Sequence, residues 1–362
     1  MFVAWRDLKF AKGRFALMGT VIVLITLLVG LLSGLTAGLG QQNISAITGL
    51  SADMIAFGAP GEGEKPSFAN STVTEKQWQR WATTPGVNRA QPLGITTTKA
   101  TAGTKSTAVS AFGVQPGSTL APAGSKLGGN GAVLSVTAAE NLGVARGDTF
   151  TLGAQQMSVA AVSGDASYSH TPVIWTSLQL WQKLTPATAE TDGPTATVIA
   201  LDTTTGAHIQ AADSVAGTRT VSTGDSLSAI GSYTSENGSL QLMRGFLFAI
   251  SALVIGAFFT VWTIQRSGDV AVLKALGAST ANLLKDALGQ ALVLLTGGTL
   301  LGTALAAGLG ALAAATAVPF LLTPATILVP AAVMIALGAL GAALSIRRIT
   351  SVDPLTALGS TR

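Results

Sequence analysis

Four long runs of uncharged, mainly apolar residues constrain this chain more than any other feature. A helix needs about 20 such residues to cross a bilayer core of about 30 Å. We predict membrane-spanning helices at residues 15–39, 239–264, 287–318 and 327–346, and only Arg244 brings a charge into them. With 48% hydrophobic and 10% charged residues, the whole chain is also too apolar for an ordinary soluble protein. It is therefore predicted to be a multi-pass membrane protein.

The charges indicate how the chain crosses the membrane. Segments 1–14, 265–286 and 347–362 together carry ten basic and four acidic residues, whereas segment 40–238 carries ten basic and thirteen acidic ones. Lys and Arg beside a span mark its cytoplasmic end. We therefore expect a cell (plasma) membrane protein with both termini and segment 265–286 in the cytoplasm, and segments 40–238 and 319–326 outside. The basic excess is thus a topology signal, and we expect no nucleic-acid partner.

The segment between the first two spans predicts an external α+β domain at residues 40–238. The text TEKQWQRWATTPGV places Trp78 and Trp81 three apart before a Pro-Gly stop, which predicts a short helix. Residues 131–153 predict strand, helix, turn and strand, and residues 155–181 predict a strand and then a strand leading into a helix. Stretches rich in Gly, Ser and Thr predict loops at 58–72, 113–131 and 186–206, and a hinge at 235–239. The predicted fold class is membrane α-helical, with four transmembrane helices and an α+β domain inserted between helices 1 and 2.

Catalytic and cofactor-binding motifs are absent from the sequence. The chain has no cysteine, which excludes disulfides, thiolate metal sites and cysteine nucleophiles. The phosphate-binding pattern GxxxxGK[ST], the zinc motif HExxH and the GxSxG elbow do not occur. We therefore predict that the chain is not an enzyme, holds no metal or cofactor itself and hydrolyses no nucleotide.

The segment QRSGDVAVLKALGAST, residues 265–280, places charge between two apolar runs. Val270, Leu273 and Gly277 follow an i, i+3, i+7 spacing, which predicts a short amphipathic helix. Gly277 suits a left-handed C-cap, and Ser279 or the threonine after it suits the N-cap of the next helix. On physical grounds, the amphipathic helix either rests on lipid head groups or binds a partner.

This segment and the C-terminus RRITSVDPLTALGSTR resemble ABC permeases of the FtsX/MacB type, in which AVLKALGAS-like text recurs and an Asp-Pro pair precedes an apolar residue, here Asp353, Pro354 and Leu355. One span, a large external domain and three further spans are the layout of that family. The resemblance implies a permease homodimer that works with two copies of a separate ABC ATPase subunit, which binds the ATP. The residues implied to form a coupling helix docked in the ATPase are Asp269, Val270, Leu273, Leu276 and Gly277.

Small residues recur at a spacing of four in two of the spans. Gly30, Gly34 and Gly38 form a doubled GxxxG pattern in the first span, which permits close backbone contact between helices. We predict that this stripe is the interface of a homodimer. The third span has a similar row at Gly298, Gly302, Ala306 and Gly310. Because small residues are common in membrane helices, ordinary packing remains the alternative for both rows.

Within the family, the chain looks similar to the permease of Gram-positive haem exporters, which implies haem as the transported substrate. Haem is largely apolar and carries two carboxylates, so its site needs a donor for the iron and a cation. We expect Arg244 to take a propionate, and Tyr233 or Glu236 to approach the iron. The full set of candidate haem-binding residues is Tyr233, Glu236, Arg244, Met243 and Tyr168.

Other interpretations stay open for these residues and for the function. Tyr233 suits interfacial anchoring, and Arg244 can extend toward lipid head groups. In the text SYSHTP, Tyr168 and His170 face the same way if the segment is extended. The alternative functions are export of a membrane lipid, a lipoprotein or an antimicrobial peptide, or an FtsX-type signalling complex that activates a cell-wall hydrolase.

Overall fold

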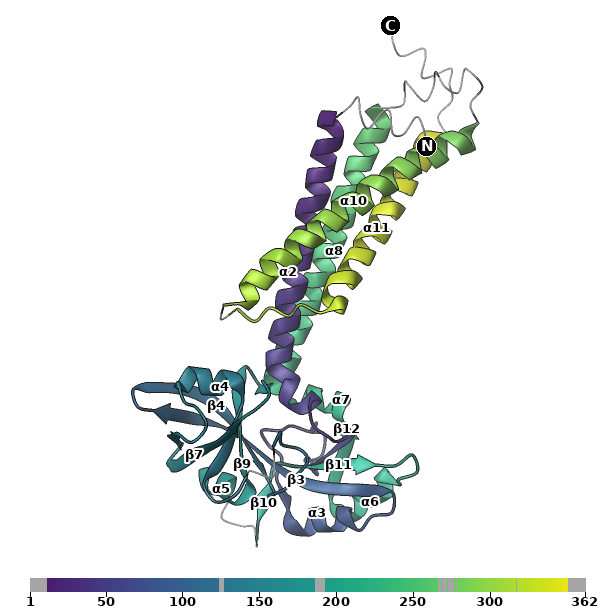
Figure 1. Cartoon of the computed structure of the whole chain (residues 1–362). Helices are drawn as coiled ribbons and strands as arrows, with labels where there is room; N and C mark the ends of the chain where they lie inside the picture. Colours follow the sequence, from purple (N-terminus) through teal and green to yellow (C-terminus); the bar gives the residue numbers. More distant parts are fainter. Residues whose placement is uncertain are drawn as a thin grey trace. The chain divides into compact units, whose positions relative to one another are not determined.

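The computed structural model of the protein describes residues 12–123, 127–185, 193–265, 279–316 and 318–350, together with residues 268, 272 and 277. The chain divides into two compact units (Figure 1). We call Met1–Leu39 with Ser239–Arg362 the membrane unit, and Gly40–Gly238 the inserted domain. These bounds coincide with the segment expected between the first two spans.

Four long helices account for the membrane-spanning part of the chain. They are α2 (Lys12–Thr48), α8 (Gly231–Gln265), α10 (Thr280–Ala314) and α11 (Pro324–Thr350). Each contains a stretch that is long and apolar enough to cross a membrane. The prediction of four membrane helices with a mixed α/β domain between the first two is therefore confirmed.

The predicted cytoplasmic segment is described only in part. The hydroxyl of Ser279 accepts a hydrogen bond from the N–H of Asn282 at 3.4 Å and caps α10, as predicted. Gly277 has a φ of 94°, the left-handed backbone expected of it. The remaining predicted coupling residues, Asp269, Val270, Leu273 and Leu276, lie outside the described residues.

The start of α8 differs from the sequence prediction. The helix begins at Gly231 and continues through residues 235–239, so the hinge expected there is not a break in the helix, and the boundary between the two units falls at Gly238 and Ser239. The hydroxyl of Ser235 donates to the carbonyls of Gly231 and Ser232 at 3.4 and 3.1 Å. Because serine can bond carbonyls of its own helix in this way, a polar stretch need not interrupt a helix.

Two rows of small residues bring α2 and α10 together. A Cβ atom added at Gly30 of α2 would lie 2.7 Å from the Cβ of Ala306 in α10. In the other direction, a Cβ added at Gly302 of α10 would lie 2.7 Å from the carbonyl oxygen of Val23 in α2. Only glycine permits so close a contact between backbones. The small-residue rows of both helices therefore serve packing inside one chain.

The other glycines of the α2 row face the segment between α10 and α11. The ring of Phe320 occupies the space of a side chain at Gly34, and the backbone of Pro319 does the same at Gly38. The N–H of Leu321 also donates to the carbonyl of Gly34 at 3.1 Å. A second copy of the chain cannot use this row without displacing the segment. The homodimer stays a prediction, and these glycines do not favour it.

A ten-stranded sheet is the frame of the inserted domain. Its strands are β1 (Met54–Gly58), β3 (Val87–Ala102), β4 (Lys105–Val114), β5 (Gly131–Leu134), β6 (Thr149–Leu152), β7 (Gln155–Val162), β8 (Ser167–Tyr168), β9 (Thr171–Ser177), β11 (Val198–Thr203) and β12 (Thr218–Ser222). The strand order is β12-β1-β11-β3-β4-β9-β5-β7-β6, with β8 paired to β9. An additional pairing of β3 with β6 closes six of these strands into a ring. A separate ribbon joins β2 (Val73–Thr74) to β10 (Thr195–Ala196).

Short helices cover part of this sheet. They are α3 (Glu75–Ala82), α4 (Val136–Leu142), α5 (Leu178–Leu184), α6 (Ile209–Ala216) and α7 (Thr223–Ser226). The predicted helix with Trp78 and Trp81 is α3, and both indoles are buried in one core cluster with Trp181 of α5. The predicted orders β5–α4–β6 and β7, then β9–α5, are also confirmed.

Several strands of the sheet, β1 and β12 among them, were not expected from the sequence. The loop predicted at 186–206 is wrong, because it contains β10 and β11, and β11 lies between β1 and β3. The long antiparallel pair β3–β4 was not predicted at all. These strands are rich in threonine, which the loop prediction counted as a turn residue. Threonine is β-branched and fits a pleated strand well.

Candidate ligand-binding site

The candidate site is centred on the tight turn that joins β8 to β9. Tyr168 pairs with Thr171, so Ser169 and His170 are the two turn residues. Their φ angles are 49° and 62°, in the left-handed region that non-glycine residues seldom adopt. Two-residue hairpin turns of this hand usually use Asn-Gly or Asp-Gly. The Ser-His pair therefore needs support from its surroundings.

That support comes from the C-terminal part of α2. The N–H of Ser169 donates to the carbonyl of Asn43 at 3.0 Å, and the N–H of His170 donates to the carbonyl of Gln42 at 3.2 Å. The Ser169 hydroxyl lies 2.8 Å from the hydroxyl of Ser232 on α8. The turn is thus held by residues of both long helices that enter the inserted domain.

His170, Glu236 and Asn43 form a polar cluster beside the turn. The Nε2 atom of His170 lies 2.7 Å from Oε2 of Glu236, and the Asn43 amide donates to the same oxygen at 3.3 Å. The Ser232 hydroxyl donates to Oδ1 of Asn43 at 2.8 Å, which turns the amide nitrogen toward Glu236. Asn43 is 1% exposed, whereas the side chains of His170 and Glu236 are 30% and 43% exposed. The cluster is thus buried on the Asn43 side and partly exposed to solvent on the side of His170 and Glu236.

The two tyrosines of the predicted site are both part of the domain core. Tyr168 is 8% exposed and makes edge contacts with Phe68 and Phe112, at ring distances of 5.9 and 5.6 Å. Burial raises the pKa of the Tyr168 hydroxyl well above its ordinary value, so a phenolate ligand is disfavoured there. Tyr233 is half-buried against the same aromatic cluster. Tyr168 and His170 do not share one face, because the chain turns between them.

Arg244 and Met243 belong to the membrane unit. The Arg244 guanidinium lies 5.9 Å from the ring centre of Phe248, a cation–π contact one turn further along α8. Among the described residues, no acidic side chain lies within ion-pair distance of Arg244. Met243 is 48% exposed. Arg244 is thus available to an anion, and its place in one site with Glu236 stays a prediction.

A cleft of about 540 Å³ lies in the inserted domain next to the turn. Hydroxyl and aromatic side chains line it, among them Ser71, Thr97, Thr197, Trp181 and Ser232. No acidic or basic side chain of the described chain lines this cleft. It therefore offers no cation for the carboxylates of a ligand such as haem.

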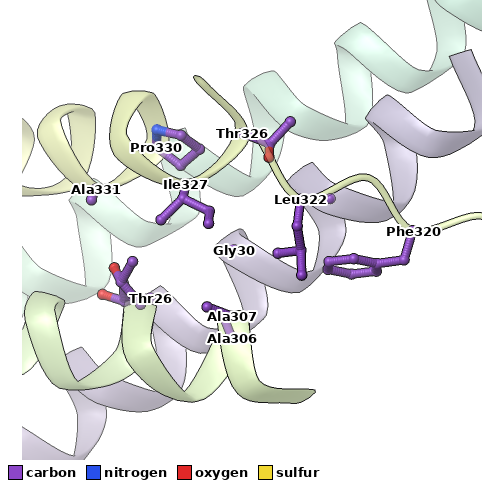
Figure 2. A pocket seen from close by; sticks show the side chains of 12 residues that line it. Thr26, Gly30, Ala306, Ala307, Phe320, Leu322, Thr326, Ile327, Pro330 and Ala331 are labelled. Carbon is purple, nitrogen blue, oxygen red and sulfur yellow. The ribbon is translucent and has the colours of Figure 1, made fainter. Parts of the chain in front are cut away.

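A second cavity lies among the helices of the membrane unit (Figure 2). Thr26, Phe320, Ile327 and Pro330 are among its lining residues, and Figure 2 shows Thr26 across the cavity from Pro330. The Thr26 hydroxyl is buried, with no hydrogen-bond partner in the part of the chain that the structure describes. The free volume is only about 10 Å³, room for about one water molecule. This cavity is too small for a transported compound.

Two protein-family models together match most of the chain. A model of the MacB-like periplasmic core domain matches residues 15–218, and a model of the FtsX-like permease C-terminal region matches residues 242–354. The chain belongs to the FtsX/MacB family of permeases. The family expected from the motifs at residues 265–280 and 347–362 is therefore confirmed, and with it an ABC-type membrane permease.

Full-length relatives of this FtsX/MacB permease carry more specific names. A Staphylococcus haemolyticus protein named for a hemin transport system, HrtB, is 26% identical over 99% of both chains. A Mycobacterium bovis protein named only as an ABC transporter permease is 25% identical over the same share. Among solved structures, the extracellular domain of YknZ from Gram-positive bacteria covers 48% of this chain and 99% of its own, with 12% identity and a TM-score of 0.35.

The structure adds Asn43 to the residues singled out from the sequence, and it places His170 beside Glu236 instead of beside Tyr168. Only Glu236 of the predicted haem-binding set lies in the polar cluster. Asn43 directly follows Gln41 and Gln42 near the end of α2, so the sequence does not show which of these amides is buried and needs hydrogen-bond partners. The left-handed turn at His170 was not evident either, because Ser-His is not a usual turn pair.

Proposed function

We propose that this permease is the membrane subunit of an ABC-type exporter that removes an amphipathic compound, haem above all, from the outer leaflet of the cell membrane. A separate ABC ATPase subunit hydrolyses the ATP. The observation that carries the proposal is the Glu236 carboxylate, anchored through one oxygen by His170 and Asn43. The name of the staphylococcal relatives supports haem as the compound.

The chemistry of the cluster suits a ligand with an electrophilic centre. Among the described residues, Oε1 of Glu236 has no hydrogen-bond partner, so it is free to meet the ligand. Carboxylate oxygen is a hard donor and matches a hard metal ion such as ferric iron better than the thioether of Met243 does. Arg244, which has no acidic partner in the described chain, would bind a propionate as a charge-assisted pair.

We further propose the topology and partners that the charge pattern and the family imply. Both termini and residues 265–286 lie in the cytoplasm, and the helix with Leu273 and Leu276 docks in the ATPase. Leu273→Asp should abolish co-purification of the ATPase, because a charge in a dry cleft costs several kcal/mol. Normal co-purification would favour a helix resting on lipid head groups instead.

The proposed function is tested by the ATPase activity of the purified permease–ATPase complex in lipid vesicles. Ferric haem should stimulate the activity, whereas phospholipid, a lipopeptide or a cationic antimicrobial peptide should not. Glu236→Gln should lower the stimulation strongly, and Glu140→Gln, at an exposed position of the inserted domain, should leave it unchanged. If a lipid or a peptide stimulated the ATPase activity and haem did not, that compound would take the place of haem as the proposed substrate. Binding and activation of a cell-wall hydrolase without any transport would instead make this a signalling complex.

A further inference from the structure

We infer that His170 and Asn43 are positioning residues that hold one oxygen of the Glu236 carboxylate so that the other oxygen, Oε1, is presented to the ligand. This inference rests on the proposed function and adds two residues to its site. Both act through Glu236 and need not touch the ligand. Metal-binding groups commonly depend on such outer contacts for their orientation.

The first observation is that both donors converge on one atom. His170 Nε2 and Asn43 Nδ2 lie 2.7 and 3.3 Å from Oε2 of Glu236, and they come from different elements of the fold. When the Glu236 carboxylate is ionised it only accepts, and Nε2 of His170 is then the donor of the shorter contact. Two donors on one oxygen restrict rotation of the carboxylate. The free oxygen therefore keeps one direction.

The second observation is that the hydrogen-bond pattern around Asn43 fixes its amide. Ser232 donates to Oδ1 of Asn43 at 2.8 Å, and the Ser169 hydroxyl lies 2.8 Å from that of Ser232. The Asn43 amide nitrogen is also 3.2 Å from Nε2 of His170. Since Nε2 donates to Glu236, it does not accept from Asn43, and one of the two N–H groups of the amide donates to Oε2 of Glu236. Asn43 is thus oriented to assist the carboxylate and is itself shielded from the ligand.

The third observation is the backbone of the turn. Ser169 and His170 both have left-handed backbones, which are unfavourable for residues other than glycine. The hairpin would close more easily with Asn-Gly at these positions. The strained turn is held by the carbonyls of Gln42 and Asn43, and it aims the imidazole of His170 at Glu236. This arrangement indicates that the histidine side chain is needed for the contact with Glu236. Hairpin closure alone does not require it.

The test uses the full-length permease, purified and titrated with ferric haem while its absorption spectrum is recorded. His170→Asn keeps a residue that tolerates the left-handed turn but is too short to reach Glu236. His170→Gln places an amide nitrogen near the position of Nε2. We expect His170→Asn to weaken haem binding about 10–100-fold. His170→Gln should restore wild-type binding and the wild-type spectrum.

A second variant keeps the inference testable if the turn does not tolerate substitution. Ser232→Ala leaves both donors in place and removes only the hydrogen bond that orients Asn43, so it should weaken haem binding less than His170→Asn does. Wild-type affinity in His170→Asn and Ser232→Ala alike would overturn the inference. A spectrum altered by both His170→Asn and His170→Gln would show that His170 binds the iron itself, which also overturns it. If the wild-type protein binds no haem, the proposed function itself fails.

Discussion

The two units of this permease reach tight packing by opposite means. In the membrane unit, Gly30 and Gly302 let the backbones of α2 and α10 touch. In the inserted domain, the largest fully buried side chains include Trp81, Phe57 and Phe112. Lipid is as apolar as a leucine side chain, so close backbone approach stabilises helix contacts there, whereas aromatic burial stabilises a core in water. Adding atoms should therefore damage the first unit, and removing them should damage the second.

Removing the indole of Trp81 should have the largest effect on stability. The side chain is fully buried, and its Nε1 donates to the hydroxyl of Thr218 at 3.1 Å. Trp81→Ala should lower the free energy of unfolding by about 3–5 kcal/mol. Chemical denaturation of the full-length protein followed by circular dichroism measures the change. Val215→Ala, at an exposed position of the same domain, is the control; equal stability of the two variants would contradict an aromatic core.

Adding a side chain to the α10 row should have the next largest effect. Gly302→Leu would push against the backbone of Val23 and should destabilise the membrane unit by about 1–3 kcal/mol. Gly308 lies on the same helix with no atom within 4 Å of an added Cβ, so Gly308→Leu should be nearly neutral. The two variants are compared by the temperature at which each aggregates in detergent. If both variants matched the wild type, the α2–α10 contact would not be as described.

Two buried threonines, one in each unit, test how the cost of losing a hydroxyl depends on its hydrogen bonds. In the inserted domain, the Thr218 hydroxyl accepts from Trp81 and donates to Asp213 at 2.7 Å, so Thr218→Val should cost about 1–3 kcal/mol. In the membrane unit, the buried Thr299 hydroxyl has no hydrogen-bond partner among the residues that the structure describes, so Thr299→Val should cost nothing or stabilise. The free energy of unfolding of each variant, compared with that of the wild type, measures both effects. A large loss from Thr299→Val would reveal a partner for that hydroxyl.

The smallest effect concerns an exposed contact between β11 and β3. Hydrogen bonds from Asn88 and then Arg89 lower the pKa of Asp202. A lowered folded pKa contributes stability that is present above the unfolded pKa and is lost as pH falls through the folded one. Asp202→Asn should thus differ slightly from wild type at neutral pH and converge with it well below pH 4. Unfolding curves across that range test this, and a difference that grew toward acid pH would show the opposite sign.

The sequence was enough to predict the membrane helices because length and hydrophobicity alone define them. It did not reveal what the rows of small residues contact. The spacing of Gly30, Gly34 and Gly38 requires only that some backbone lies close, and the same chain or a copy satisfies that requirement equally well. Phe320 and Pro319 fill that position here. The path of the chain after α10 decides whether the same chain or a second copy makes this contact.

The candidate site was predicted in part for a related reason. Glu236 was singled out because a haem site needs a donor for the iron and this residue lies just outside the second predicted span. His170 was paired with Tyr168 on the assumption of an extended segment, but the left-handed turn sends the tyrosine into the core and the histidine to Glu236. Backbone conformation at non-glycine turn residues depends on tertiary contacts, here with Gln42 and Asn43 of α2. Local sequence does not contain that information.

The absorption spectrum of the full-length permease, purified from cells grown with added haem, tests the central claim most directly. We expect haem to co-purify with the wild-type protein and with Glu140→Gln, with one common spectrum. Glu236→Gln should lose the bound haem or show a shifted Soret band, because the carboxylate held by His170 and Asn43 is the proposed donor to the iron. An unchanged spectrum and haem content in Glu236→Gln would contradict the account.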